Sequence, residues 1–317
     1  MAESKIPLIA VVGPTASGKT SLAVEICKHY GAEAVSCDSM QIYQGMDIAT
    51  AKPTVDEMQG IKHHMMGFLS PLESFSVAKY CDMAKEVIAD INSRNKKAVL
   101  VGGTGLYFNS LVDNIEFLDE ETDFEYREFL KKEAEEKGAQ YLLDMLYGID
   151  PESAKELHMN NLGRIIRALE IYHSTGKTKS MQNEESHKNP SPYELTAICL
   201  DAKDRQFLYD RINCRVDIML ETGLLEEAKE FFDANVGKTA AQAIGYKELE
   251  PYFKGEKSLD DCIENLKMQT RRYAKRQLTW FRRDERMNFL YIDEYSSAEE
   301  LLKAALEIIE RGVKLEK

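Results

Sequence analysis

Residues 8–20 read Leu-Ile-Ala-Val-Val-Gly-Pro-Thr-Ala-Ser-Gly-Lys-Thr and decide the fold of the N-terminal part of the chain. An apolar run of strand length precedes the pattern G-x-x-x-x-G-K-T at residues 13–20, and an amphipathic helical pattern follows it. In such a loop successive backbone N–H groups point inward, and the positive end of the helix dipole adds to them. The stretch therefore predicts a strand, a phosphate-binding loop and a helix. Lys19 is placed to neutralise phosphate oxygens, and Thr20 to ligate a phosphate-bound Mg²⁺.

The composition is that of a globular protein. The 317 residues suffice for one large domain or two smaller ones, with 44% hydrophobic and 30% charged residues. Six scattered cysteines form no Cys-x-x-Cys pair and no cluster at metal-ligand spacing, so we expect reduced thiols. The N-terminus leaves no room for a signal peptide and no apolar run reaches membrane-spanning length, so we expect a cytoplasmic protein.

The formal net charge of −13 disfavours unspecific binding of nucleic acid, because the field of the whole molecule repels phosphate. The charge is unevenly spread, however. Residues 271–283 hold six Lys or Arg in thirteen positions, and such a local patch can override the overall repulsion.

A second strand is expected over residues 32–37, and it ends at Asp38-Ser39-Met40-Gln41. Open α/β sheets bind ligands beyond their strand ends, so Asp38 is a candidate for the rim of an active site. The alternative is that Asp38 caps a turn. Next come His63 and His64, adjacent on an extended segment; they point to opposite sides, which favours hydrogen-bonding roles over a zinc site.

A helical pattern over residues 75–92 and a short apolar strand over residues 98–101 complete a strand, helix, strand alternation, which is typical of a parallel sheet. This strand ends in Gly102-Gly103-Thr104-Gly105. The acidic residue that positions Mg²⁺ in nucleotide-hydrolysing P-loop proteins is missing there. The glycines are consistent either with a tight turn or with close approach of a ligand to the backbone.

Residues 113–185 change to charged, helix-forming sequence without strand signals, with helices expected over residues 124–138, 140–147, 151–157 and 160–174. The prediction is an α/β fold: a P-loop NTPase-like parallel sheet flanked by helices, with an all-helical insertion domain. Its parts are the first part of the core (residues 1–112), the insertion (113–185) and the second part of the core (186–317).

The second part of the core begins with a strand over residues 195–200 and a helix over residues 205–232. Arg211 and Arg215 lie four apart on that helix, where they either clamp phosphate oxygens or pair with neighbouring acids. A long helix over residues 263–281 carries a basic stripe, which indicates either contact with a phosphate backbone or a solvated face. A strand over residues 289–292 and a helix over residues 297–311 end the domain.

Several blocks now stand together in one order: the P-loop, Asp-Ser-Met-Gln-Ile-Tyr (38–43), Gly-Met-Asp-Ile-Ala-Thr-Ala-Lys-Pro (45–53), Gly-Gly-Thr-Gly-Leu-Tyr (102–107), Gly-Tyr (245–246) and residues 271–280. With these blocks the chain resembles the bacterial tRNA dimethylallyltransferases, also called tRNA isopentenylpyrophosphate transferases, over essentially its whole length. The resemblance implies transfer of a dimethylallyl group from dimethylallyl diphosphate to N6 of the adenosine 3′-adjacent to the anticodon, in tRNAs that read codons beginning with U. It also implies a P-loop that binds the donor diphosphate and not a nucleoside triphosphate.

The resemblance carries roles onto individual residues. It makes Asp38 the general base, with Lys19 and Thr104 as further catalytic residues, and it places Mg²⁺ on Thr20. The residues implied for the donor diphosphate are Gly13, Pro14, Thr15, Ala16, Ser17, Gly18, Lys19, Thr20 and Arg215. Those implied for the tRNA anticodon stem-loop are Asp38, Ser39, Met40, Gln41, Thr104, Arg127, Gly163, Arg164, Arg167, Gln242, Gly245, Tyr246, Lys247, Thr270, Arg271, Arg272, Lys275, Arg276 and Gln277. We expect a monomer without membrane contact. The alternatives are a P-loop small-molecule kinase, which would turn over ATP, and a non-enzymatic RNA-binding scaffold.

Overall fold

The computed structural model describes residues 5–117, 123–186, 189–234, 237 and 239–312. The chain divides into two compact units, one made of Met1–Val112 with Pro192–Lys317 and the other of Asp113–Ser191. The second unit thus ends six residues later than the 113–185 expected from sequence. Each unit has a buried apolar core of its own.

The first unit is built on a six-stranded sheet with the order β3-β2-β4-β1-β5-β6, in which every neighbouring pair is parallel. The predicted α/β class with a parallel sheet is confirmed, and the ends of the predicted strands shift by only one or two residues. The sequences of β1 and β4 are near-continuous apolar runs, as expected for strands that are buried on both faces of a parallel sheet. The strands are β1 (Ile6–Val12), β2 (Glu33–Ser36), β3 (His63–His64), β4 (Ala98–Gly102), β5 (Tyr193–Asp201) and β6 (Met287–Tyr291).

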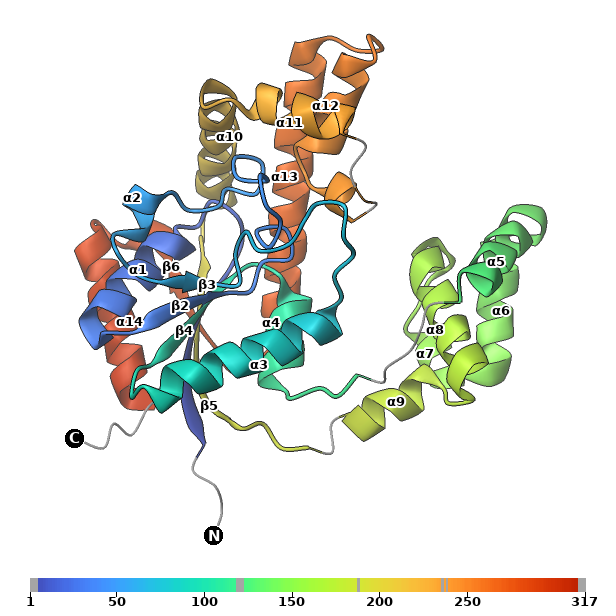
Figure 1. Cartoon of the computed structure of the whole chain (residues 1–317), viewed down its shortest axis with the longest axis horizontal. Coiled ribbons are helices and arrows are strands. Elements are labelled where there is room, and N and C mark those ends of the chain that lie inside the picture. Colours follow the sequence, from blue (N-terminus) through green and yellow to red (C-terminus); the bar gives the residue numbers. More distant parts are fainter. Residues whose placement is uncertain (1–4, 118–122, 187–188, 235–236, 238, 313–317) are drawn as a thin grey trace. The chain divides into compact units, whose positions relative to one another are not determined.

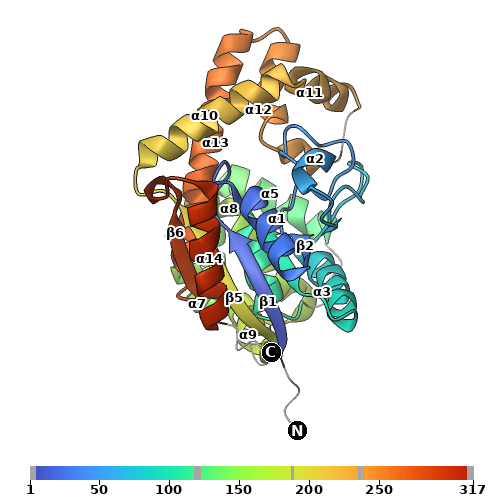
Figure 2. The ribbon, with the colours of Figure 1, turned by 90° about the vertical axis from the view of Figure 1, so that its left-hand side faces the viewer.

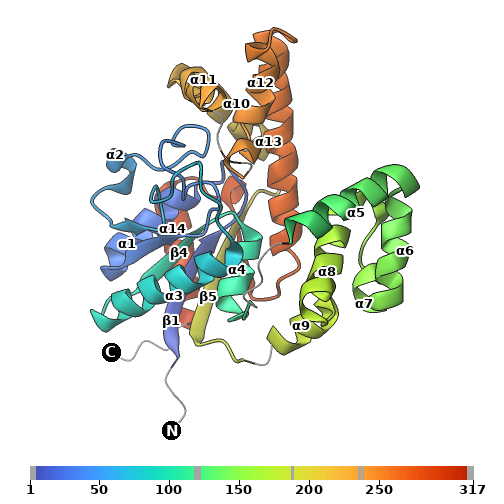
Figure 3. The same cartoon turned by 45° about the vertical axis from the view of Figure 1, so that its right-hand side comes forward.

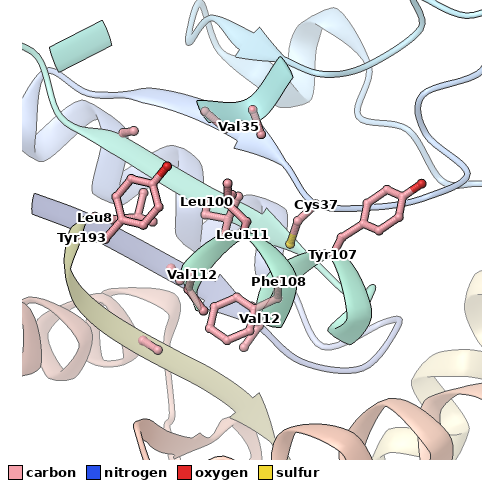
Figure 4. Close-up of a cluster of buried hydrophobic side chains, with 14 of the residues drawn as sticks. Leu8, Val12, Val35, Cys37, Leu100, Tyr107, Phe108, Leu111, Val112 and Tyr193 are labelled. Atoms are coloured by element: carbon pink, nitrogen blue, oxygen red, sulfur yellow. The ribbon is translucent and has the colours of Figure 1, made fainter. Parts of the chain in front are cut away.

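Helices cover both faces of this sheet. On one face lie α1 (Lys19–Tyr30) and α14 (Ala298–Gly312) (Figure 2). Their side chains Ile26 and Ile309 belong to the same buried cluster as Ile9 of β1. On the other face lie α3 (Val77–Ser93) and α4 (Gly105–Val112) (Figure 3). The α4 residues Phe108 and Leu111 close over the strands in the core of Figure 4. The result is a three-layer sandwich in which the carboxyl ends of the parallel strands meet at one edge.

Beyond that edge stand α10 (Arg205–Glu221), α11 (Leu224–Asp233), α12 (Tyr246–Phe253) and the long α13 (Leu259–Phe281) (Figure 1). The single helix predicted over residues 205–232 is wrong. Gly223 adopts a φ of 105°, which breaks the helical path between α10 and α11. The loop after β2 packs Ile42 and Met46 into the core of this helical group. Shorter elements of the unit are α2 (Val55–Met58), η2 (Ala240–Gln242) and η3 (Ile292–Glu294).

The two neighbouring histidines have structural roles, as the sequence favoured. His64 pairs through Nε2 with Oε2 of Glu33 at 2.8 Å, and Nδ1 of His63 lies 2.9 Å from the carbonyl of Ile61. No group of three or more potential metal ligands occurs among the described His, Cys, Asp and Glu residues. None of the helices that the structure describes is long and apolar enough to cross a membrane.

All regular elements described in the second unit are helices. Its core forms where Leu130, Leu142 and Leu146 meet Ile165 and Leu169 from the facing helix. The elements are α5 (Phe124–Lys137), α6 (Ala139–Ile149), α7 (Pro151–Lys155), η1 (Met159–Asn161), α8 (Leu162–Thr175) and α9 (Lys179–Ser186).

Candidate active site

The P-loop connects the end of β1 to the start of α1, as predicted. Gly13 has a φ of 139°, and a Cβ there would lie 2.5 Å from the carbonyl oxygen of Leu200 on β5. Gly18 precedes α1 in a left-handed conformation with a φ of 88°. These two positions require glycine, because a side chain would meet neighbouring backbone at the first and would strain the turn at the second. The loop is therefore held tightly against the sheet.

Lys19 is a partly buried cation at the centre of this loop. Its Nζ donates to the carbonyl of Pro14 at 2.5 Å. Burial and, to a smaller extent, the nearby Arg215 guanidinium lower the pKa of Lys19 from 10.5 to about 8, although the Asp38 carboxylate opposes the shift. Burial also lowers the pKa of Arg215. Two desolvated cations that face one another are a site for a multivalent anion, because the anion would relieve their repulsion.

The arginines of α10 have separate roles. Nε of Arg211 donates to the carbonyl of Ala16 at 2.9 Å and so supports the P-loop from outside. The ion-pair alternative is not realised for either arginine in the described part of the chain, because Asp210 bonds to Gln206 and the nearby Asp217 pairs with Lys267. Arg215 lies close enough to the other two charges for its guanidinium to lower the pKa of Lys19 and for the Asp38 carboxylate to oppose the lowering of its own pKa.

Asp38 lies just beyond β2, in a turn that it helps to form. Its Oδ1 accepts a hydrogen bond from the backbone N–H of Met40 at 2.9 Å, so the capping role considered from the sequence is real. The other carboxylate oxygen has no hydrogen-bond partner among the described residues and is available for a ligand. Oγ1 of Thr104 accepts from the backbone N–H of Ser39 at 3.0 Å, and the Thr104 N–H donates to the carbonyl of Cys37. These bonds tie the ends of β2 and β4 together and fix the position of Asp38.

Tyr273 on α13 completes this group, and sequence reasoning missed it. Burial and the nearby Asp38 carboxylate raise the pKa of its phenol, so Tyr273 lies close to Asp38. The available signal was its spacing of four from Gln277, which puts both side chains on one side of the helix.

The glycine-rich turn after β4 is explained by α13. A Cβ on Gly103 would lie 2.1 Å from Nε2 of Gln277, and a Cβ on Gly105 would lie 2.3 Å from the Trp280 ring. The amide of Gln277 is only 5% exposed; it accepts from the N–H of Thr15 and donates to the carbonyl of Gly103, both at 2.9 Å. Both ends of the Gln277 amide are thus used inside the protein, and the expected contact of Gln277 with tRNA stays a prediction.

The other candidates for RNA contact differ in accessibility. Tyr246 is 7% exposed and its hydroxyl donates to Glu227, so its side chain is a structural element and does not present a free surface. Gly245 is also buried. Oγ1 of Thr270 donates to the carbonyl of Leu266 within α13. Exposed side chains remain at Gln242, Lys247, Arg272, Lys275 and Arg276, while Arg271 donates to Asn213 at 2.6 Å.

In the second unit, the arginines expected to contact RNA lie on α5 and α8. Arg127 forms a two-pronged ion pair with the buried carboxylate of Glu170, one arm of which measures 2.7 Å, so its guanidinium is held by the fold. Gly163 and Arg164 are exposed in the first turn of α8. Arg167 lies one turn further along and approaches Glu170 at 3.7 Å.

The parallel sheet, the glycine-constrained loop and the two partly buried cations beside it define an α/β protein of the P-loop class. The model of the IPP transferase family matches residues 41–284, and the chain belongs to that family, which confirms the resemblance inferred from its motifs. It is 48% identical over 298 residues to the tRNA dimethylallyltransferase of Acetivibrio thermocellus, covering 93% of this chain and 95% of the relative. It is likewise 48% identical over 283 residues to that of Bacillus subtilis, covering 89% and 90%.

Solved structures agree with these relatives. The chain is similar to a crystal structure of the tRNA isopentenylpyrophosphate transferase from Bacillus halodurans, with a TM-score of 0.72, 43% identity and coverage of 98% of this chain and 99% of that one. It is also similar to a eukaryotic dimethylallyltransferase acting on tRNA, with a TM-score of 0.81, 27% identity and coverage of 98% and 81%.

Proposed function

We propose that this protein transfers the dimethylallyl group of dimethylallyl diphosphate to N6 of the adenosine 3′-adjacent to the anticodon, in tRNAs that read codons beginning with U. The observation that carries the proposal is the juxtaposition of Asp38, with one oxygen free, and the two partly buried cations Lys19 and Arg215. Relatives that are named tRNA dimethylallyltransferase and match nearly the whole chain support it.

The cationic side of the site suits the donor. Lys19, Arg215 and the loop amides that remain free would bind the diphosphate. As the allylic C–O bond breaks, the bonding electron pair leaves with the diphosphate and its negative charge grows. The two cations are held in place before the reaction and are poorly solvated, so they stabilise this charge without reorganising. The Pro14 carbonyl that now holds Lys19 would be exchanged for phosphate oxygens.

The carboxylate side of the site suits the acceptor. The N6 lone pair of adenine is delocalised into the ring and is a weak nucleophile. A carboxylate that accepts the N6 proton while the C–N bond forms helps this step, and the free oxygen of Asp38 is suited to that role. The bond from Met40 N–H fixes the other oxygen, so the carboxylate is oriented before the base arrives. The adenosine must leave the stack of its loop to reach the site.

Mg²⁺ fits the donor set that is present. The described residues offer no cluster of three acidic or histidine ligands, but Mg²⁺ usually keeps several waters and binds substrate phosphates with only one or two protein oxygens. Thr20, the second residue of α1, would supply its hydroxyl. When bound, the metal would neutralise part of the diphosphate charge.

RNA contacts are proposed from the exposed cations of each unit considered by itself. On α13 these are Arg272, Lys275 and Arg276, which form no ion pair within the described part of the chain. On α8 they are the exposed Arg164 and the partly exposed Arg167, which approaches Glu170 at 3.7 Å. We further propose that the protein acts as a monomer in the cytoplasm.

Mass spectrometry of a synthetic anticodon stem-loop RNA, incubated with the protein, dimethylallyl diphosphate and Mg²⁺, tests the proposal. The RNA should gain the mass of one C₅H₈ group. A matched RNA with inosine in place of the target adenosine lacks the exocyclic amine and should gain nothing. No mass gain from a folded protein, together with turnover of ATP on a small molecule, would favour the kinase alternative instead.

A further inference from the structure

α13 is joined to the P-loop by a hydrogen bond of one side chain, Gln277. The Gln277 amide bridges two elements: its oxygen accepts from the N–H of Thr15, inside the P-loop, and its nitrogen donates to the carbonyl of Gly103 at the end of β4. The amide is buried, and Gly103 has no room for a side chain beside it. The helix therefore controls the position of one backbone amide in the loop proposed to hold diphosphate.

The same helix carries the proposed RNA contacts on its outer side. Arg272, Lys275 and Arg276 are exposed, whereas Gln277 and Tyr273 face the strand ends. α13 is firmly docked there, because Trp280 Nε1 also donates to Asn109 Oδ1 at 2.7 Å. One continuous helix of 23 residues thus joins the surface proposed for RNA to the loop proposed for the donor.

We propose that Gln277 is a positioning residue that couples RNA binding at α13 to diphosphate binding at the P-loop. This inference rests on the proposed function. RNA bound to the outer face of α13 restrains the helix, and Gln277 passes the restraint to Thr15. A loop that is already ordered costs less free energy to organise around diphosphate, so RNA raises diphosphate affinity. By linkage, diphosphate raises RNA affinity by the same factor.

A purely structural role for Gln277 makes a different prediction. Removing the amide would leave the Thr15 N–H and the Gly103 carbonyl without partners and would lower stability in either case. Only the coupling role also changes the ratio of diphosphate affinities with and without RNA. That ratio is therefore the quantity to measure.

The experiment is calorimetric titration of inorganic diphosphate and Mg²⁺ into the protein, alone and with saturating anticodon stem-loop RNA. In the parent protein RNA should tighten diphosphate binding by about fivefold or more, which is the usual lower range of such coupling. Gln277→Met has similar length but no polar atoms, and the factor should fall to near one. Gln269→Met is the matched control, because the Gln269 amide bonds only to Asn265 on the same helix; its factor should equal that of the parent.

Circular dichroism and thermal unfolding establish that each variant is folded. If Gln277→Met does not fold, Gln277→Asn replaces it, since the shorter amide cannot reach both partners, and the same loss of coupling is expected. If both ligands still bind, either of two results overturns the inference. In the first, RNA leaves the diphosphate affinity of the parent protein unchanged; in the second, RNA raises this affinity by the same factor in the folded Gln277 variant as in the parent. Failure of the parent protein to bind diphosphate or RNA at all would instead overturn the proposed function.

Discussion

The phenol of Tyr246 on α12 donates a hydrogen bond of 2.8 Å to Oε1 of Glu227 on α11. The same carboxylate accepts from three successive backbone N–H groups, those of Asp47 at 2.9 Å, Ile48 at 2.8 Å and Ala49 at 2.9 Å. Two sequence blocks almost 200 residues apart, 45–53 and 245–246, therefore meet at one acid. Glu227 lies in neither block and holds the loop after β2 against the helical group.

Replacing Glu227 by Ala should lower the free energy of unfolding by about 2–3 kcal/mol, because four donors lose their acceptor and several of them are shielded from water. Urea denaturation measures the loss. Glu226→Ala is the control, since Glu226 is exposed and accepts no hydrogen bond in the described structure. Equal effects of the two substitutions would show that the Glu227 network contributes little to stability.

Asp38→Asn should reduce the single-turnover rate of prenyl transfer by about two or more orders of magnitude, the usual effect of losing a positioned base. The amide oxygen can still accept from the N–H of Met40, so the turn, the fold and diphosphate affinity should be retained. Rapid-quench assays with stem-loop RNA measure the rate, and calorimetry measures the affinity. A rate like that of the parent protein would show that Asp38 is not the base. Loss of the folded state would show that Asp38 acts as the cap of the turn.

The sequence predicted those parts of the site whose signals are local. The P-loop, Asp38 and Thr104 each follow a strand directly, so recognising the strand located the residue. The partners of these residues lie far away in the chain. Gln277 acts on Thr15 across 262 positions, and no local pattern distinguishes its buried amide from an exposed one. The sequence therefore did not indicate that the Gln277 amide lies buried between the P-loop and the end of β4.

The helical group beyond the sheet shows the same limit. The apolar spacing over residues 205–232 is helical on both sides of Gly223, so periodicity alone predicted one helix. The break depends on packing: Leu224 is fully buried in the core that Met46 also enters, and a straight helix would carry that side chain elsewhere. Tertiary burial thus decided a boundary that the residue pattern left undetermined.

Diphosphate affinity should fall as the pH rises through about 8, the lowered pKa of Lys19. Below that pH the ammonium is charged and binds the anion fully; above it, affinity should drop about tenfold per pH unit until the pKa of the complex is reached. Calorimetric titration of inorganic diphosphate on both sides of this pH tests the expectation. Diphosphate itself also titrates with pH, and it does so equally with the parent protein and with Lys19→Arg. The arginine of the variant stays charged, so the difference between the two proteins isolates the titration of Lys19.

The lowered pKa of Lys19 should also raise the free energy of unfolding as the pH rises, although the same rise in pH weakens diphosphate binding. The folded protein releases the Lys19 proton near pH 8, whereas the unfolded chain holds it to about 10.5, so the unfolded state binds more protons between these values. Burial of the charged lysine therefore opposes folding below pH 8, and this opposition is lifted as the pH rises to 10.5. Relative to Lys19→Met, the parent protein should gain stability over that interval in denaturant titrations. A constant difference would contradict the lowered pKa.

The final prediction concerns the exposed cations of α13. With a net charge of −13 the molecule as a whole repels RNA, so binding must depend on a few local charges. Each phosphate neutralised adds about 0.7–0.9 to the slope of log affinity against log salt concentration. Replacing Arg272 and Lys275 by Ala should therefore weaken stem-loop binding and flatten this slope by about one to two units, while diphosphate binding without RNA stays unchanged.

The control for this pair removes two exposed lysines from other helices, Lys79 on α3 and Lys303 on α14, and so changes the net charge equally. Long-range repulsion alone would weaken RNA binding in both double variants to the same extent and would leave the two slopes alike. Direct phosphate contact at α13 instead predicts that only the Arg272 and Lys275 variant loses slope, because counterions are released only where a cation meets the RNA backbone. Fluorescence anisotropy of labelled stem-loop RNA over a series of salt concentrations separates these cases. If the slope of the α13 variant matches that of the control, this face of the helix is merely solvated, and Arg164 and Arg167 on α8 become the next pair to replace.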